Sequence, residues 1–292
     1  MRRAAIASVL AVALVACGGG DGDEPEPAAT DVSLVPATPP TGVPSPTVDL
    51  PEESPSELEV TEITVGTGRA ADIGDTLLVN YVGVRSEDGA EFDSSYGREP
   101  FPVTLGQSRV ILGWEQGLLG ASGGDRLQLD IPADLAYGDS PQGDIIQPGD
   151  ALSFVIDVLA VVPPNDAAEA PTEDDIVAQD APFTELVVED DRAGDGTTID
   201  RGMTAFLNLV LARADNGAIL VSTWSEPGPA QYLVADSGRL DGLVEGIAGM
   251  QVGGRRTILI PYEQAFGTDG ETTLGLPGET DVIAIVDLIA AY

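Results

Sequence analysis

Residues able to perform covalent or metal-based chemistry are scarce in this chain. It has 292 residues, no His and a single Cys. Without His, a Ser-His-Asp or Cys-His mechanism is impossible, and so is a zinc site that uses imidazole. A lone Cys excludes internal disulfides and paired-cysteine redox or metal motifs. Few kinds of chemistry remain.

The charge of the chain limits the possible classes of function further. Asp and Glu number 49 against 13 Lys+Arg, all of them Arg, for a formal net charge of −36. This argues against a nucleic-acid partner, because a phosphate backbone is held mainly by clustered Lys and Arg. Asp174-Asp175 and Asp190-Asp191 with Asp195 invite a calcium interpretation, but they lack the ligand spacing of an EF-hand. A solvated acidic surface is favoured, and we expect no metal and no cofactor.

The spacing of apolar residues indicates the strands and the helix that must position any functional site. The ranges 75–85, 126–131 and 151–161 are rich in aliphatic residues, and 126–131 alternates apolar and polar residues as a half-buried strand does. Only 110–120 has helical spacing, with Ile111, Trp114 and Leu118 on one side. One short helix against an antiparallel sheet predicts an α+β fold.

The chain repeats itself. Glycines of the first half recur 129 positions later, from Gly113 matching Gly242 to Gly138 matching Gly267, and earlier ones recur 128 positions later, as Gly89 matches Gly217. Arg126 likewise matches Arg255. The sequence therefore predicts one domain of roughly 105 residues in tandem, within the usual domain size of about 100–200 residues, at 58–162 and 183–292.

The N-terminus is typical of an export signal. Two arginines precede an apolar run, Ala4 to Ala16, that is shorter than the roughly 17 residues a spanning helix needs. The residues around Cys17 resemble a bacterial lipobox, which implies lipidation of Cys17, cleavage before it and attachment to a membrane. A buried free Cys beside a spanning or core helix is the alternative. We expect a signal peptide at 1–17.

Two segments lack the composition of a folded core. Residues 18–57 and 163–182 are rich in Pro and acidic residues and contain no Arg. Such composition is typical of disorder. We expect a disordered acidic tether at 18–57 and an acidic linker at 163–182.

A resemblance emerges from motifs in the first repeat. They run in one order: Asn80-Tyr81-Val82-Gly83, Asp88-Gly89, Phe92-Asp93-Ser94-Ser95, Pro100-Phe101, Val110-Ile111-Leu112-Gly113-Trp114-Glu115, Ala136-Tyr137-Gly138 and Phe154. This series resembles the FKBP-type peptidyl-prolyl isomerases over essentially all of 58–162. The resemblance implies a half-barrel antiparallel sheet wrapped around one short helix. It also implies catalysis without nucleophile, metal or cofactor.

The resemblance also implies an aromatic pocket between helix and sheet. Its walls would be Tyr81, Phe92, Phe101 and Phe154, with Trp114 as the floor. The backbone N–H of Ile111, which follows Val110, and the hydroxyl of Tyr137 would donate to substrate carbonyls. Ile146 would line the mouth, and Asp93 with Arg98 would form a polar side. Read alone, the aromatic residues could be core and Asp93 with Arg98 a surface pair.

The second repeat departs from this pattern. Its equivalents of the implied site are Leu209 for Tyr81, Leu220 for Phe92, Val221 for Asp93, Leu243 for Trp114, Phe266 for Tyr137 and Ala284 for Phe154. We expect an inactive copy, which would be either an apolar groove for unfolded chains or a spacer. The run 282–291 reads as a last strand.

These features together predict an extracytoplasmic, lipid-anchored isomerase of the bacterial cell membrane. Its partners would be proline-containing segments of exported proteins, and it would be a monomer. The alternative is a non-catalytic binding protein for unfolded or partner polypeptides, and a third option is an inert surface protein. Asp139 and Asp144, near the expected pocket rim, favour peptides with basic residues flanking the proline.

Overall fold

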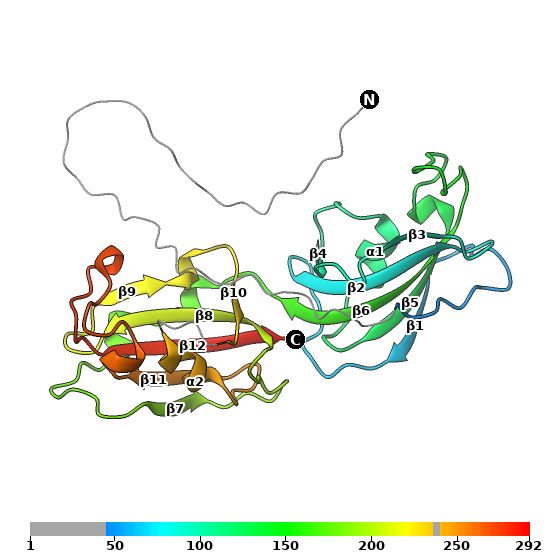
Figure 1. Ribbon diagram of the computed structural model, residues 1–292. Helices are drawn as coiled ribbons and strands as arrows, with labels where there is room; N and C mark the ends of the chain where they lie inside the picture. The colour runs from blue at the N-terminus through cyan, green and yellow to red at the C-terminus, as the bar shows by residue number, and fades with distance from the viewer. Residues whose placement is uncertain (1–44, 236–239) are drawn as a thin grey trace, which may run out of the picture.

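The computed structural model describes residues 45–235 and 240–292. These residues form two domains of the same architecture, each an antiparallel six-stranded sheet with one short α-helix (Figure 1). The predicted α+β fold and its tandem duplication are confirmed. The predicted signal peptide, Cys17 and most of the tether lie outside the described residues.

The first domain contains seven elements besides its 3-10 turn. They are β1 (Glu59–Thr64), β2 (Thr76–Arg85), β3 (Glu91–Ser94), β4 (Phe101–Thr104), α1 (Leu112–Gly117), β5 (Arg126–Ile131) and β6 (Leu152–Val162). The sheet order is β1-β5-β6-β2-β3, with β4 also pairing with β2. Strands predicted at 75–85, 126–131 and 151–161 therefore correspond to β2, β5 and β6, and the predicted helix contains α1.

The second domain repeats this plan. Its elements are β7 (Val187–Arg192), β8 (Thr204–Arg213), β9 (Ile219–Ser222), β10 (Ala230–Leu233), α2 (Asp241–Ile247), β11 (Arg255–Ile260) and β12 (Val282–Ala291). The sheet order is β10-β8-β12-β11-β7, with β9 also pairing with β8. The strand predicted at 282–291 coincides with β12.

Two glycines let α1 lie directly on β5. A Cβ atom at Gly113 would come within 2.4 Å of the Ile131 side chain, and one at Gly117 within 2.5 Å of Leu129. Only glycine permits so close a helix-to-sheet approach. It places Trp114, between the two glycines in sequence, in the buried core. The second domain repeats the contact with Gly242, Gly246, Ile258 and Ile260.

Each domain is preceded by a segment that packs on its sheet. Val48 packs against Val82, Val84 and Val155, and Ile176, 128 positions later, packs against Val210, Ala212 and Trp224. These contacts explain why successive residues of β2 and β8 are apolar and buried. They correct the predicted boundaries: described residues 45–57 and the linker 163–182 hold apolar side chains that bury on the domain that follows, so composition alone misassigned them.

The two domains meet through equivalent residues. One apolar cluster contains Leu78, Ala160 and Val162 from the first domain and Phe206, Ala290 and Tyr292 from the second. These are matched pairs of the repeat, and the rings of Phe206 and Tyr292 stack with centroids 6.3 Å apart. Figure 1 shows the C-terminus at this junction. The cluster makes this part of the interface apolar.

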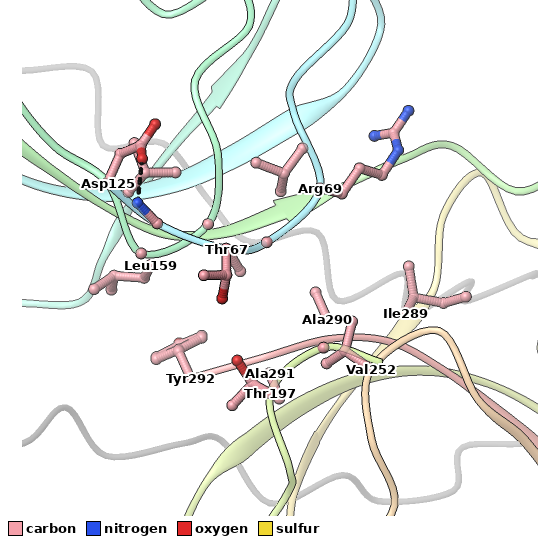
Figure 2. A pocket seen from close by; sticks show the side chains of 18 of the residues that line it. Thr67, Arg69, Asp125, Leu159, Thr197, Val252, Ile289, Ala290, Ala291 and Tyr292 are labelled. Carbon is pink, nitrogen blue, oxygen red and sulfur yellow. Dashed lines mark hydrogen bonds between the residues drawn. The ribbon is translucent and has the colours of Figure 1, made fainter. Parts of the chain in front are cut away.

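A cleft of about 890 Å³ lies beside this contact. Figure 2 shows side chains of both domains around it, including Thr67 and Leu159 from the first and Thr197 and Ile289 from the second. Leu159 and Ile289 occupy the matching bulges of β6 and β12, where the pairing with β2 and β8 shifts register. None of the predicted site residues lines this cleft.

Within residues 45–235 and 240–292, no helix has the length and apolar character needed to cross a membrane. The longest helix there, α2, has seven residues. Over the same residues no cluster of metal-ligating side chains is found.

Candidate active site

Five aromatic side chains of the first domain form one cluster, which we name the aromatic cluster. It comprises Tyr81 on β2, Phe92 on β3, Phe101 on β4, Trp114 on α1 and Phe154 on β6. Tyr81 and Trp114 meet edge to face with ring centroids 5.1 Å apart, and Trp114 and Phe154 do so at 5.2 Å. Edge-to-face packing is a favoured arrangement of aromatic rings. The sequence-predicted rings are thus brought together.

The aromatic cluster is closed on one side and open on the other. Tyr81, Trp114 and Phe154 are buried in the core of the domain, whereas Phe101 is 39% exposed. Val110 and Ile111, at the entry to α1, are partly buried against the same core, and Ile146 is buried in it. An apolar ligand can therefore reach the cluster at Phe101, its most exposed ring.

A polar chain borders the rings. The Tyr81 hydroxyl donates a short hydrogen bond to Asp93, and the Arg98 guanidinium donates to the other Asp93 oxygen at 2.8 Å. Burial, and after it the Asp93 carboxylate, raises the pKa of Tyr81. The hydroxyl therefore stays protonated at neutral pH. Asp93 and Arg98 are exposed, so their ion pair adds little stability, and it serves chiefly to orient Tyr81.

Tyr137 supplies a second hydroxyl near these groups. It follows the 3-10 turn η1 (Ala133–Leu135) and is 38% exposed. Burial and the charge of Asp93 raise its pKa. A protonated hydroxyl at a partly exposed position can donate to a ligand carbonyl.

Gly83 belongs to the site, although the sequence did not single it out. It pairs with Phe154 across β2 and β6, and a Cβ atom at position 83 would lie 2.6 Å from the Phe154 ring and 2.8 Å from Phe92. Only glycine leaves room for both rings. The signal was present in the repeat: Leu211 and Ala284 replace Gly83 and Phe154 and also face each other, across β8 and β12.

The second domain fills the same space mostly with aliphatic side chains. Leu209, Leu243 and Ala284 are buried in its core, with Leu220 and Phe266 packed against it. Here Val221 stands where Asp93 stands in the first domain, and valine cannot orient a hydroxyl. The aromatic cluster and its polar chain are therefore a property of the first domain.

Comparison with known proteins agrees with this geometry. Residues 67–159 and 193–289 match the model of the family described as FKBP-type peptidyl-prolyl cis-trans isomerase. An FK506-binding protein of Streptomyces anulatus is 46% identical over 119 residues, which cover 40% of this chain and 96% of the relative. The peptidyl-prolyl cis-trans isomerase FKBP10 of Mus musculus is 30% identical over 235 residues, covering 80% of this chain and 37% of the relative.

A crystal structure of the three FKBP domains of wheat FKBP73 aligns with 80% of this chain and 94% of its own, at 15% identity and a TM-score of 0.35. The family match covers most of both sheets, without β1 and β7, and spans more than half of the chain. Members of this family isomerise peptidyl-prolyl bonds. The chain therefore belongs to the FKBP-type peptidyl-prolyl cis-trans isomerases and carries two domains of that family in tandem.

Proposed function

We propose that the first domain is the isomerase, that the second is not catalytic, and that the substrates are Xaa-Pro bonds of exported polypeptides. This assignment rests on the aromatic cluster with its Tyr81–Asp93–Arg98 chain, which among residues 45–235 and 240–292 is found in the first domain and not in the second. In the second domain, buried aliphatic residues occupy the equivalent space. Its contacts through Phe206 and Tyr292 support a structural role.

Elementary chemistry explains how such a site accelerates the reaction. Rotation about a peptide bond meets a barrier of about 18–20 kcal/mol because amide resonance is lost at the twisted midpoint. An apolar aromatic surface disfavours the charge-separated planar amide and favours the less polar twisted one. Only interactions stronger in the twisted state lower the barrier. The Tyr137 hydroxyl and the Ile111 N–H would donate hydrogen bonds to the carbonyl groups that flank the proline, while the proline ring packs against the aromatic cluster.

Removing the Tyr137 hydroxyl tests this assignment. In the full chain, Tyr137→Phe should lower kcat/KM for an Xaa-Pro tetrapeptide by about three- to tenfold, the contribution of one hydrogen bond. The matched control, Phe266→Tyr, adds a hydroxyl at the equivalent place in the second domain and should change nothing. A protease-coupled isomerisation assay measures both. A folded chain without acceleration would remove the catalytic assignment and leave polypeptide binding.

Charge near the site should bias the choice of peptide. Asp139 and Asp144 are exposed on the loop between η1 and β6, and the charge of Arg98 is already matched by Asp93. Arg-flanked peptides should therefore react about three- to tenfold faster than Glu-flanked ones at low salt, and the ratio should fall as salt screens the charges. Neutralising both carboxylates, as Asp139→Asn with Asp144→Asn, should abolish the ratio. An unchanged ratio in that double variant would contradict this explanation.

We further propose that the protein acts outside the cytoplasm, held to the bacterial cell membrane by lipid on Cys17. Support comes from the basic-apolar-Cys series at the N-terminus and from the Pro-rich acidic stretch that follows it. Expressed in a bacterium, the chain should sediment with membranes and incorporate labelled fatty acid. Cys17→Ser should release it from the membrane fraction and abolish the label. Equal membrane association of both proteins would refute the anchor.

A further inference from the structure

One carboxylate holds the loop between β4 and α1. Glu115 accepts a hydrogen bond from the backbone N–H of Gly106 at 2.6 Å through Oε2, and one from that of Ser108 at 2.8 Å through Oε1. Its own backbone N–H donates to the carbonyl oxygen of Ile111 at 3.3 Å. Glu115 therefore ties the start of the loop to its end. We name this arrangement the Glu115 clamp.

The loop needs such restraint. Ser108 has φ of +52°, and Gly106 has φ of +84°. A left-handed conformation is easy for glycine but unfavourable for serine, so Ser108 holds it only when its surroundings over-determine it. Charge-assisted hydrogen bonds to backbone N–H groups are among the stronger ones available. The two bonds to Glu115 supply that restraint.

This loop leads to the residues at the entry to α1. It ends at Val110 and Ile111, which are partly buried against the core that contains Tyr81, Trp114 and Phe154. Ile111 immediately precedes α1, and its carbonyl also accepts from the N–H of Trp114 at 3.0 Å. Any shift of the loop therefore moves the Ile111 N–H relative to the rings.

We infer that Glu115 is a positioning residue for the isomerase: it touches no substrate but, through the loop, fixes where the Ile111 N–H meets the substrate carbonyl. This inference rests on the assignment of catalysis to the first domain. The second domain is consistent with this inference. Val244 stands at the equivalent position, is fully buried, and has a side chain that cannot accept a hydrogen bond. The copy without the aromatic cluster therefore has no carboxylate at this position of its helix.

Three variants of the full chain test the clamp. Glu115→Ala should lower kcat/KM for an Xaa-Pro tetrapeptide by about tenfold, mostly through KM, because the N–H contact exists in ground and transition states alike. Glu115→Gln keeps one carbonyl oxygen as an acceptor and should lose only about threefold. Glu62→Ala, on the exposed strand β1, removes the same charge far from the loop and should match the parent.

Amide hydrogen exchange separates positioning from general destabilisation. In Glu115→Ala the amides of Gly106 and Ser108 should exchange faster, while those of β5 and β6 stay as protected as in the parent. Unchanged kcat/KM, or faster exchange spread over the whole domain, would overturn the inference. An inactive parent chain would instead refute the assignment of catalysis, and the exchange data would still decide whether the clamp exists.

Discussion

The full chain carrying both Gly83→Leu and Phe154→Ala should be almost as stable as the parent chain. Its kcat/KM should fall at least about 100-fold. The pair copies what the second domain has at these positions, Leu211 opposite Ala284. Removing the Phe154 ring deletes a wall of the aromatic cluster, and the new leucine fills the space. The isomerase assay and denaturant unfolding measure the two effects.

The two single substitutions test whether the two positions are energetically coupled. Phe154→Ala alone leaves a cavity and should cost about 3–5 kcal/mol of unfolding free energy. Gly83→Leu alone forces a side chain into the Phe154 and Phe92 rings and should cost about 1–3 kcal/mol or more. Combined, the losses should largely cancel, because the side chains face each other. Additive losses in the double variant would show that the two positions are not coupled.

Arg255→Ala should destabilise the second domain by about 3 kcal/mol, whereas the matched Arg126→Ala in the first should cost about 1 kcal/mol. Arg255 contacts both oxygens of Asp287 at 2.9 Å, and Arg126 contacts Asp157 at 2.5 and 2.8 Å. The Asp287 side chain is 2% exposed, against 19% for Asp157. Water can therefore solvate Asp157, but it cannot reach Asp287.

The remaining partners of the two carboxylates also differ. Asp157 keeps the Tyr96 hydroxyl at 2.6 Å, while Asp287 keeps, among the residues that the structure describes, the half-exposed Arg192 at 3.1 Å. Burial raises the pKa of Asp287, because removal from water penalises its charged form.

Unfolding of the second domain can be followed through Trp224 in a Trp114→Phe background, since the chain has only these two Trp residues. Adding Asp287→Asn should recover most of the loss in Arg255→Ala. Equal losses in the two domains would contradict the argument from burial.

Much of the fold and most of the site could be predicted from the sequence. Alternation revealed β5 as a strand, and the apolar runs revealed β2 and β6. The half-buried face that alternation predicts for β5 is wrong, because the polar residues Gln128 and Asp130 are buried as well as the apolar ones. The aromatic cluster was expected from the family resemblance that its ordered motifs carry. Such local signals need no knowledge of distant contacts.

The rest depended on distant contacts. Val48 and Ile176 are isolated apolar residues in Pro-rich acidic segments, and only the sheet that each covers makes them core residues. The bonds of Glu115 to Gly106 and Ser108 require the loop geometry, which residue types alone do not give. Gly83 became intelligible only beside the ring of Phe154.

The contact between the domains has a consequence for how such a chain arises. Leu78, Ala160 and Val162 of the first domain are the counterparts of Phe206, Ala290 and Tyr292 of the second, so each domain offers its neighbour the same face of itself. An interface of this kind is isologous, the arrangement of a two-fold dimer. In separate chains its formation would depend on protein concentration. Joining the copies through one linker makes the association intramolecular, and dilution no longer separates them.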